Sequence, residues 1–390
     1  MRIGLDARYV YPSHVHGIGR YSAELVRHLV PRVRARGHEL VVFRRADLPE
    51  PLARGDGVRE IPVPFLPVSL ATLTRLGPIA RAERLDVFHA FFPVLPIGAA
   101  PRTVVTAHDL QALRVRGFHG GRGPVVALAS RLFYGLAYRW SFGAADRILA
   151  GSAWTRDDVM STYRIPSRRF RVVHEGLGDA FFEPGDETGD PAVLASVGLD
   201  ASRPYLLHVG NTRPQKNVEG LLDVFRALVD RAESGAAPVL VIAGVRDRFF
   251  DGVQRRAARL GLVERVRFLE NVSDAALRAL YRRAALYVTM ALHEGFGFTP
   301  LEAMASGCPV AAAAAGALPE VLGDAYLALP TESPTQAACA ILGLLGDPTA
   351  RAALVAAGRA RATRFRWETT ARETLDAYLE LASPAPALVS

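Results

Sequence analysis

The sequence predicts an α/β protein with two parallel sheets covered by helices, and three observations lead to that prediction. Short apolar runs alternate with longer amphipathic segments along most of the 390 residues. The runs are apolar on both faces, which is typical of strands covered on each side by helices, as in parallel βαβ units. At roughly 150 residues per domain, a chain of this length should form two or three domains, and we start from two.

Eleven apolar runs are interpreted as strands. They span 3–6, 40–43, 87–90, 103–106, 147–150, 171–174, 205–209, 239–243, 266–269, 286–289 and 310–313. Helical patterns lie between them, among others at 21–30, 218–231, 251–260 and 274–283.

The alternation is interrupted once, at residues 180–204, where Pro, Gly and acidic residues collect. Such a stretch is typical of an interdomain linker. We therefore expect domains at 1–185 and 186–364, followed by a terminal segment at 365–390. Ligands of doubly wound sheets bind at the carboxyl ends of the strands, so we expect the site in a cleft between the two halves.

The composition excludes several classes of protein. With 50% hydrophobic and 22% charged residues, the chain is neither disordered nor a fibrous repeat. Cys308 and Cys339 are too few for a disulfide framework, which favours a reducing cytoplasm. The N-terminus is too polar for a signal segment, and no window reaches the roughly 18 apolar residues of a membrane span, so we expect a soluble or peripheral protein.

The net charge of +8 belongs to the N-terminal half. Residues 1–185 hold 26 Arg against 16 acidic residues, while 186–390 hold 21 basic against 23 acidic residues. Such a half is either a solvated basic surface or one that attracts an anionic partner such as phospholipid. The segment 111–145 mixes Arg with Phe, Tyr and Trp. Such a segment could lie on a membrane interface or close over a lipid-linked acceptor. The alternative is a buried helix pair whose Arg side chains face solvent.

The densest motif is HEGFGFTPLEAMASGCPV at 293–310. A glycine-containing loop follows an expected strand, and a helix is expected to begin near Thr299 with Pro300 at its first position. The amides of Phe298 and Thr299 then lie at the positive end of the helix, where phosphate is the commonest ligand.

Two carboxylates flank this loop. Glu294 precedes it, and Glu302 is expected in the first helical turn. They would repel phosphate but accept hydrogen bonds from hydroxyl groups, which sugars offer in pairs. Alternatively, Glu302 is a favourable first-turn acid and Glu294 a solvated loop residue.

Two cations lie in VGNTRPQKN at 209–217, after the first strand of the second half. Arg213 and Lys216 are placed to clamp a diphosphate and stabilise it as a leaving group. Lys216 is the only lysine of the chain, which indicates that a compact ammonium matters at this position. The alternative is a solvated loop pair.

Two further segments follow strands of the first half. HGIGRYSAEL at 16–25 contains Gly17 and Gly19, which allow close backbone approach to a phosphate or simply form a tight turn. Ser22 stands where a dinucleotide fingerprint needs a third glycine, which argues against an NAD site. VVTAHDL at 104–110 ends in His108 and Asp109, as a site pair or a structural one. The sequence has no Cys/His metal spacing and no DxD pair.

Taken together, these motifs resemble the retaining GT-B glycosyltransferases of family 4 over most of the chain. The specific marker is the E-x7-E element from Glu294 to Glu302, followed by AMASGCPV and by LPEV at 318–321. The segments GIGRY and TAHDL look most like the mannosyltransferase-B-like branch. The resemblance implies two Rossmann-like domains facing across a cleft, the first binding acceptor and the second the nucleotide sugar, with 365–382 returning to the first as a helix.

The resemblance also implies roles for residues. The diphosphate would be held by Gly17, Ile18, Gly19, Arg213, Lys216, Phe298 and Thr299. The donor sugar would be held by His108, Glu294, Phe296 and Gly297, and the nucleoside by Val272 and Glu302. Catalysis would rest on His108, Arg213, Lys216 and Glu294.

The implied reaction moves a hexose from a GDP- or UDP-sugar to a hydroxyl of a glycan, lipid-linked or small-molecule acceptor, with GDP-mannose as the first expectation. No metal, cofactor or nucleic acid is expected. A GT-B epimerase, a non-catalytic nucleotide-sugar-binding protein and a Rossmann oxidoreductase are the alternatives. The chain departs from the family at His16, where many relatives carry Gly, and at His174 and Glu175, where relatives usually show Pro or Asn.

Overall fold

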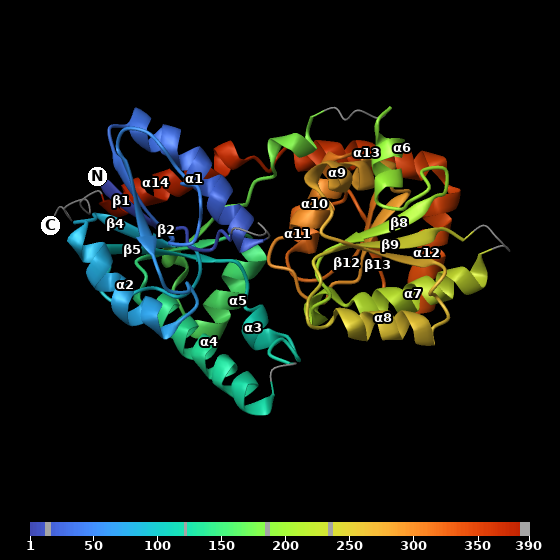
Figure 1. Cartoon of the computed structure of the whole chain (residues 1–390), viewed down its shortest axis with the longest axis horizontal. Coiled ribbons are helices and arrows are strands. Elements are labelled where there is room, and N and C mark those ends of the chain that lie inside the picture. The colour runs from blue at the N-terminus through green and yellow to red at the C-terminus, as the bar shows by residue number, and fades with distance from the viewer. Residues whose placement is uncertain (12–16, 121–122, 184–187, 233–236, 383–390) are drawn as a thin grey trace. The chain divides into compact units, whose positions relative to one another are not determined.

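The computed structural model describes residues 1–11, 17–120, 123–183, 188–232 and 237–382. It contains two all-parallel sheets with helices on both faces of each (Figure 1). The seven-stranded sheet has the order β3-β2-β1-β4-β5-β6-β7, and the six-stranded sheet has the order β10-β9-β8-β11-β12-β13. Both orders reverse direction next to the first strand, which is the doubly wound Rossmann-like arrangement. The predicted α/β class is confirmed.

Unit 1 comprises residues 1–113, 128–176 and 365–390. Its strands are β1 (Arg2–Asp6), β2 (Glu39–Arg45), β3 (Val58–Val63), β4 (Val87–Ala90), β5 (Arg102–Ala107), β6 (Arg147–Ala150) and β7 (Phe170–Val172). Its helices are α1 (Ile18–Ala35), α2 (Leu70–Ala82), α3 (Gln111–Arg114), α4 (Pro124–Ala144, in this unit from Leu128), α5 (Ala153–Tyr163) and α14 (Trp367–Ala382).

Unit 2 comprises residues 114–127 and 177–364. Its strands are β8 (Tyr205–Val209), β9 (Val239–Gly244), β10 (Val266–Glu270), β11 (Leu286–Thr289), β12 (Val310–Ala313) and β13 (Leu327–Leu329). Its helices are α6 (Asp190–Ser196), α7 (Val218–Arg231), α8 (Phe250–Arg259), α9 (Asp274–Arg283), α10 (Phe298–Ala305), α11 (Leu318–Leu322), α12 (Pro334–Gly346) and α13 (Pro348–Ala362). The domain boundaries expected from the sequence, 1–185, 186–364 and 365–390, stay a prediction.

The linker interpretation of 180–204 needs correction. This stretch contains α6, which packs on α9 inside unit 2. Asp190 at the start of α6 is buried, and its carboxylate accepts a hydrogen bond from Arg282 Nε at 2.9 Å. Asp190 and Pro191 therefore begin a helix of unit 2 and do not mark a linker.

Each sheet has an apolar core of its own. In unit 1, Phe43, Phe88 and Phe142 are fully buried between the sheet and its helices. In unit 2, α7 buries Leu222 and Phe225 against the sheet. Both cores are continuous, so each sheet is held by its own helices.

The last helix, α14, completes unit 1. It lies alongside α1 and contacts β4, β5 and β6 (Figure 1). Tyr378 on α14 bonds through its hydroxyl to His89 Nδ1 on β4 at 2.6 Å. At the other end of the contact, Gly176 leaves room for Trp367, because a Cβ on Gly176 would lie 2.3 Å from the Trp367 backbone nitrogen. The C-terminal segment is thus part of the first sheet's cover.

Among the described helices, none meets by itself the length and composition of a membrane span. One bent pair, α12 with α13, meets those two criteria. The inward residues of α12, among them Ala338 and Ile341, belong to the core of unit 2.

We expect Gly176→Ala to destabilise the protein, because the added methyl must displace the backbone of α14. The expected cost is about 1–3 kcal/mol, which lowers the unfolding temperature by roughly 2–10 °C. Gly135→Ala is the matched control in the same unit, since a Cβ there meets nothing within 4 Å. Thermal unfolding followed by circular dichroism measures both, and an unchanged midpoint for Gly176→Ala contradicts the packing assigned to α14.

Candidate active site

The strand order of unit 2 reverses between β8 and β11, which are direct neighbours. β9 and β10 lie on one side of this pair, and β12 and β13 on the other. The loops that leave the carboxyl ends of such a pair open a crevice in which open α/β sheets bind ligands. Both cation and carboxylate motifs of this unit follow these two strands, so the structure brings them to one edge of the sheet.

The loop after β8 presents the two cations. Residues Pro214–Lys216 form a single 3₁₀ turn, and Asn217, with φ of 49°, caps α7 by accepting from the Gly220 amide at 3.2 Å. Arg213 is exposed and its guanidinium lies 5.8 Å from the centre of the Phe118 ring. Within the described part of the chain it has no carboxylate partner, which leaves its charge available to an anion.

The loop after β11 presents Glu294, whose residue is 9% exposed. Lys216 Nζ donates a hydrogen bond to Glu294 Oε1, so two of the predicted site residues form an ion pair. The Glu294 backbone is held from behind, since its carbonyl accepts from the Ala317 amide at 2.9 Å. Gly316, with φ of 61°, permits this approach because a Cβ there would lie 2.2 Å from the same carbonyl oxygen.

Helix α10 begins at Phe298, one residue before the predicted start, and Pro300 is its third residue instead of its first. Gly297 is the N-cap in the left-handed region, with φ of 107°, and makes no side-chain cap. The first turn contains no acidic residue. The positive end of α10 is therefore not neutralised by a neighbouring acid of the helix, as expected for an anion site.

Glu302 is placed differently from the prediction. It is the fifth residue of α10 and lies beyond the first turn, because the helix starts earlier than expected. The residue is 1% exposed, and its Oε2 accepts a hydrogen bond from the Tyr281 hydroxyl at 2.9 Å. The nearby Thr299 hydroxyl is hydrogen-bonded to Tyr287 at 2.7 Å.

The predicted base loop follows β10. Val272 is half-buried there, between Asn271, whose φ is 53°, and Ser273, which caps α9 by accepting from the Ala276 amide. β10 is two strands away from β8 in the sheet order. The loop therefore lies at the same carboxyl edge as the two cations.

One buried histidine of this edge was missed from the sequence. His208 on β8 is fully buried, its Nδ1 faces the Val288 carbonyl at 3.1 Å, and its Nε2 has no hydrogen-bond partner in the described chain. A Cβ on Gly210 would lie 3.5 Å from that Nε2 and 3.8 Å from Lys216 Cε. Burial lowers the pKa of His208 to about 4, so a neutral ring lies beneath the lysine. A histidine inside an apolar strand carries no sequence signal of this kind.

In unit 1 the glycine loop follows β1. Gly17 is the N-cap of α1 with φ of 50°, and α1 has neither a side-chain cap nor an acid in its first turn. Ile18 and Gly19 form the first turn of that helix. His16, where the chain departs from the family, lies outside the described residues.

His108, at the end of β5, uses both ring nitrogens within unit 1. Nδ1 lies 2.9 Å from Glu175 Oε1, and Nε2 lies 2.9 Å from the Phe91 carbonyl oxygen. Both neighbours are acceptors when Glu175 is ionised, so the doubly protonated ring satisfies both bonds. Burial lowers the pKa of His108, but the hydrogen bond and charge of Glu175 outweigh it and the pKa is raised.

This pairing gives a physical account of Glu175, which the sequence marked only as a departure from the family. The residue is 2% exposed. A Cβ on Gly151 would lie 3.1 Å from Glu175 Oε1, so the glycine that directly follows β6 leaves room for the carboxylate. Tyr21 stacks edge-to-face on His108 with ring centres 4.8 Å apart. The imidazole is thus fixed on three sides.

A second hydrogen-bond chain supports this corner. The Tyr21 hydroxyl bonds Thr106 Oγ1 at 3.0 Å, and His89 Nε2 bonds the same oxygen at 2.7 Å. His89 in turn bonds Tyr378 of α14. The chain links α1, two central strands and α14, and none of its members was identified from the sequence as a site residue.

Comparisons with known proteins place the chain in a family. Residues 15–179 match the model "Glycosyltransferase Family 4", and residues 192–361 match "Glycosyl transferases group 1". A D-inositol 3-phosphate glycosyltransferase of Frankia alni is 31% identical over 96% of this chain and 96% of its own length. The chain belongs to the family 4 glycosyltransferases.

One more relative and one solved structure are similar to this chain. The O-antigen chain mannosyltransferase B of Escherichia coli is 28% identical over 93% of this chain and 95% of its own length. The structure of HepE from Anabaena in complex with UDP and glucose superimposes with a TM-score of 0.71 at 16% identity, covering 97% of this chain and 100% of that one. The structural likeness shows the GT-B fold, and the predicted phosphate, sugar and nucleoside roles stay predictions.

We expect Glu175→Gln to lower the pKa of His108, because burial then acts without the opposing charge. A histidine whose folded pKa is raised stabilises the protein below its unfolded pKa, and this contribution is lost as the pH rises through the folded value. NMR titration of the His108 ring measures the change, with Glu24→Gln, which removes the acid beside His28, as control. An unaltered His108 titration in Glu175→Gln is incompatible with the pairing.

We expect Glu294→Ala to lower transfer by roughly 100-fold or more, because the contact predicted for this carboxylate with the donor sugar would be lost. Affinity for nucleoside diphosphate should stay the same or rise, because binding no longer has to break the ion pair between Lys216 and Glu294. Calorimetry with GDP and UDP measures this, and Glu219→Ala, an exposed acid on α7, is the control. A parallel loss of diphosphate affinity argues against a sugar-binding role for Glu294.

Proposed function

We propose that this glycosyltransferase moves a hexose from a nucleotide sugar to an acceptor hydroxyl with retention of anomeric configuration. The observation that carries the proposal is the Lys216–Glu294 pair at the β8/β11 reversal. Arg213 lies in the same loop as the lysine and has no carboxylate partner among the described residues. Cations suit the diphosphate, and the carboxylate suits the hydroxyl groups of the sugar. One donor molecule offers both kinds of group.

Binding of such a donor would separate the ion pair. The diphosphate takes Lys216, and the freed Glu294 accepts hydrogen bonds from sugar hydroxyls. As the bond between the anomeric carbon and the phosphate oxygen breaks, Lys216, Arg213 and the α10 amides stabilise the negative charge that develops on the leaving group. In the family the acceptor attacks the face from which the diphosphate departs, so this route needs no protein nucleophile.

Mannose from GDP-mannose is the first choice of donor. It is supported by the GIGRY and TAHDL segments and by the similarity to a mannosyltransferase over nearly the whole chain. The acceptor is proposed to be a glycan, a lipid-linked sugar or a small-molecule glycoside.

The reaction is proposed to be independent of metal ions, because two side-chain cations already serve the diphosphate. Cys339 is an exposed free thiol, which fits a reducing cytoplasm as the compartment.

A panel of GDP- and UDP-hexoses tests the proposal, with released nucleoside diphosphate as the readout and EDTA in one arm. Release of GDP from GDP-mannose, little changed by EDTA, and an α-anomeric product by NMR are expected. Sugar isomerisation without an acceptor indicates an epimerase, and binding without turnover indicates a regulator. A drop of more than about tenfold with EDTA, restored by Mg²⁺ or Mn²⁺, contradicts metal independence.

We expect Lys216→Ala to reduce turnover by roughly 100-fold or more, as loss of a fixed charge in the transition state does. Lys216→Arg should recover only part, since a planar guanidinium cannot place its charge at the same point.

Chemical labelling checks the same residue without turnover. Amine-selective acylation can modify only Lys216 and the N-terminal amine, because the chain has one lysine. Saturating nucleoside diphosphate should protect Lys216 and leave the N-terminal label unchanged, as read by peptide mass spectrometry. Equal labelling of Lys216 with and without GDP or UDP removes it from the site.

A further inference from the structure

Helix α4 is apolar on two opposite faces, and one of them is uncovered. The inner face buries Ala137, Tyr138 and Phe142 in the core of unit 1. On the outer face, Leu128, Leu132, Leu136 and Trp140 follow one another at intervals of four residues, and their exposed fractions are 60, 57, 68 and 42%. A spacing of four keeps successive side chains on one side of a helix. We call these four residues the outer face of α4.

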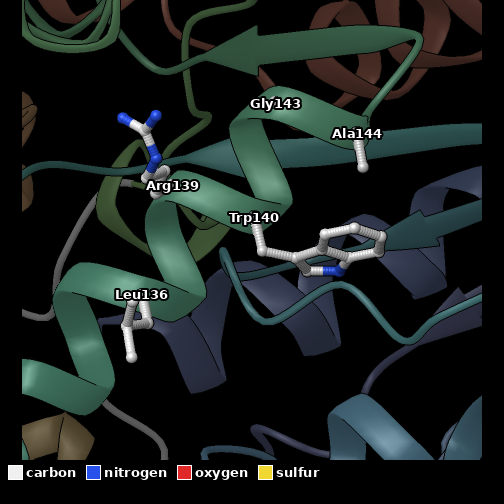
Figure 2. A pocket seen from close by; sticks show the side chains of 5 residues that line it. All are labelled: Leu136, Arg139, Trp140, Gly143 and Ala144. Carbon is white, nitrogen blue, oxygen red and sulfur yellow. The ribbon is translucent and has the colours of Figure 1, made fainter.

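The indole at one end of the outer face is held by a hydrogen bond. Trp140 Nε1 donates a hydrogen bond to the Leu95 carbonyl at 3.0 Å, so the indole's polar atom is satisfied by the protein and its ring remains at the surface. Figure 2 shows Leu136 and Trp140 projecting from the same side of the helix, at a hollow that Arg139, Gly143 and Ala144 also line. Contiguous apolar surface of this kind marks an interaction site.

The charges of α4 indicate the occupant. The helix contains Arg131 and Arg139 and no acidic residue. Both arginines are exposed, and neither has a carboxylate partner within the described ranges. An apolar stripe flanked by exposed cations is the pattern of a helix that lies in the interface of an anionic bilayer.

A second copy of the chain fits less well. Two outer faces packed against each other would bring four exposed arginines into one interface with no acid from either helix, and like charges there are costly. Crossing the bilayer is also disfavoured, because α4 does not meet the composition of a membrane span.

We propose that the outer face of α4 docks on the surface of an anionic phospholipid bilayer, with the helix lying along the interface. The leucines and the indole enter the boundary between headgroups and acyl chains, and Arg131 and Arg139 contact the phosphates. This inference is independent of the proposed reaction.

Vesicle flotation tests the proposal with the full chain. We expect binding to vesicles of phosphatidylcholine with 30% phosphatidylglycerol, weaker binding to pure phosphatidylcholine, and a blue shift of Trp fluorescence that Trp140→Phe removes. Leu132→Glu with Leu136→Glu should lower the partition coefficient by more than tenfold, because two charges would enter the apolar boundary. Arg131→Gln with Arg139→Gln should remove most of the difference between the two lipids.

The matched control is Val263→Glu with Leu292→Glu, which adds the same charge at two exposed apolar residues of unit 2. This variant should float like the wild type, apart from a small general loss of basic charge. Circular dichroism checks that each variant is folded. Equal loss of binding in test and control variants, or no binding by the wild type at low salt, overturns the proposal. Self-association that Leu132→Glu with Leu136→Glu abolishes, without vesicle binding, assigns the face to a second copy instead.

Discussion

The reversal of strand order between β8 and β11 is the constraint on which the candidate active site depends. Parallel strands deliver their following loops to one edge of the sheet, and the reversal sends the connected helices to opposite faces. Lys216 and Glu294, 78 residues apart in the chain, meet at that edge because each follows one of the two strands. Gly316 then lets the next strand's loop hold the Glu294 backbone in place. The strand order brings the two side chains together, and their opposite charges then form the ion pair.

Each unit contains a carboxylate paired with a basic side chain, and the two pairs differ in how far they are exposed to solvent. Lys216 and Glu294 keep 17 and 11% of their side chains exposed, so both partners can be reached from solvent. His108 and Glu175 keep 10 and 3%, and the second ring nitrogen of His108 is also bonded, to a carbonyl. Removing either partner of the latter pair leaves a buried polar group unsatisfied. The first pair is therefore open to solvent, whereas the second is closed off from it.

The sequence predicted the central elements well and the peripheral ones poorly. Helices α7 and α9 have the expected bounds because side-chain caps, Asn217 and Ser273, mark their starts. Strand β3 was missed because its alternating polar residues and Pro62 hide it, and β13 because it has only three residues. Glu302 was placed one turn too early since Pro300 suggested a later helix start. The Glu175–His108 contact joins residues 67 positions apart, which no local pattern reports.

The return of the chain to unit 1 has a consequence for how the protein is made. Residues 1–113 and 128–176 leave the ribosome first, yet their sheet lacks one covering helix until residues 365–382 are synthesised. Until then His89 has no Tyr378 to bond, and the apolar surface that α14 covers is open. All residues of unit 2, 114–127 and 177–364, are synthesised before this helix. Unit 1 can therefore complete its helix layer only after the residues of unit 2 have been synthesised.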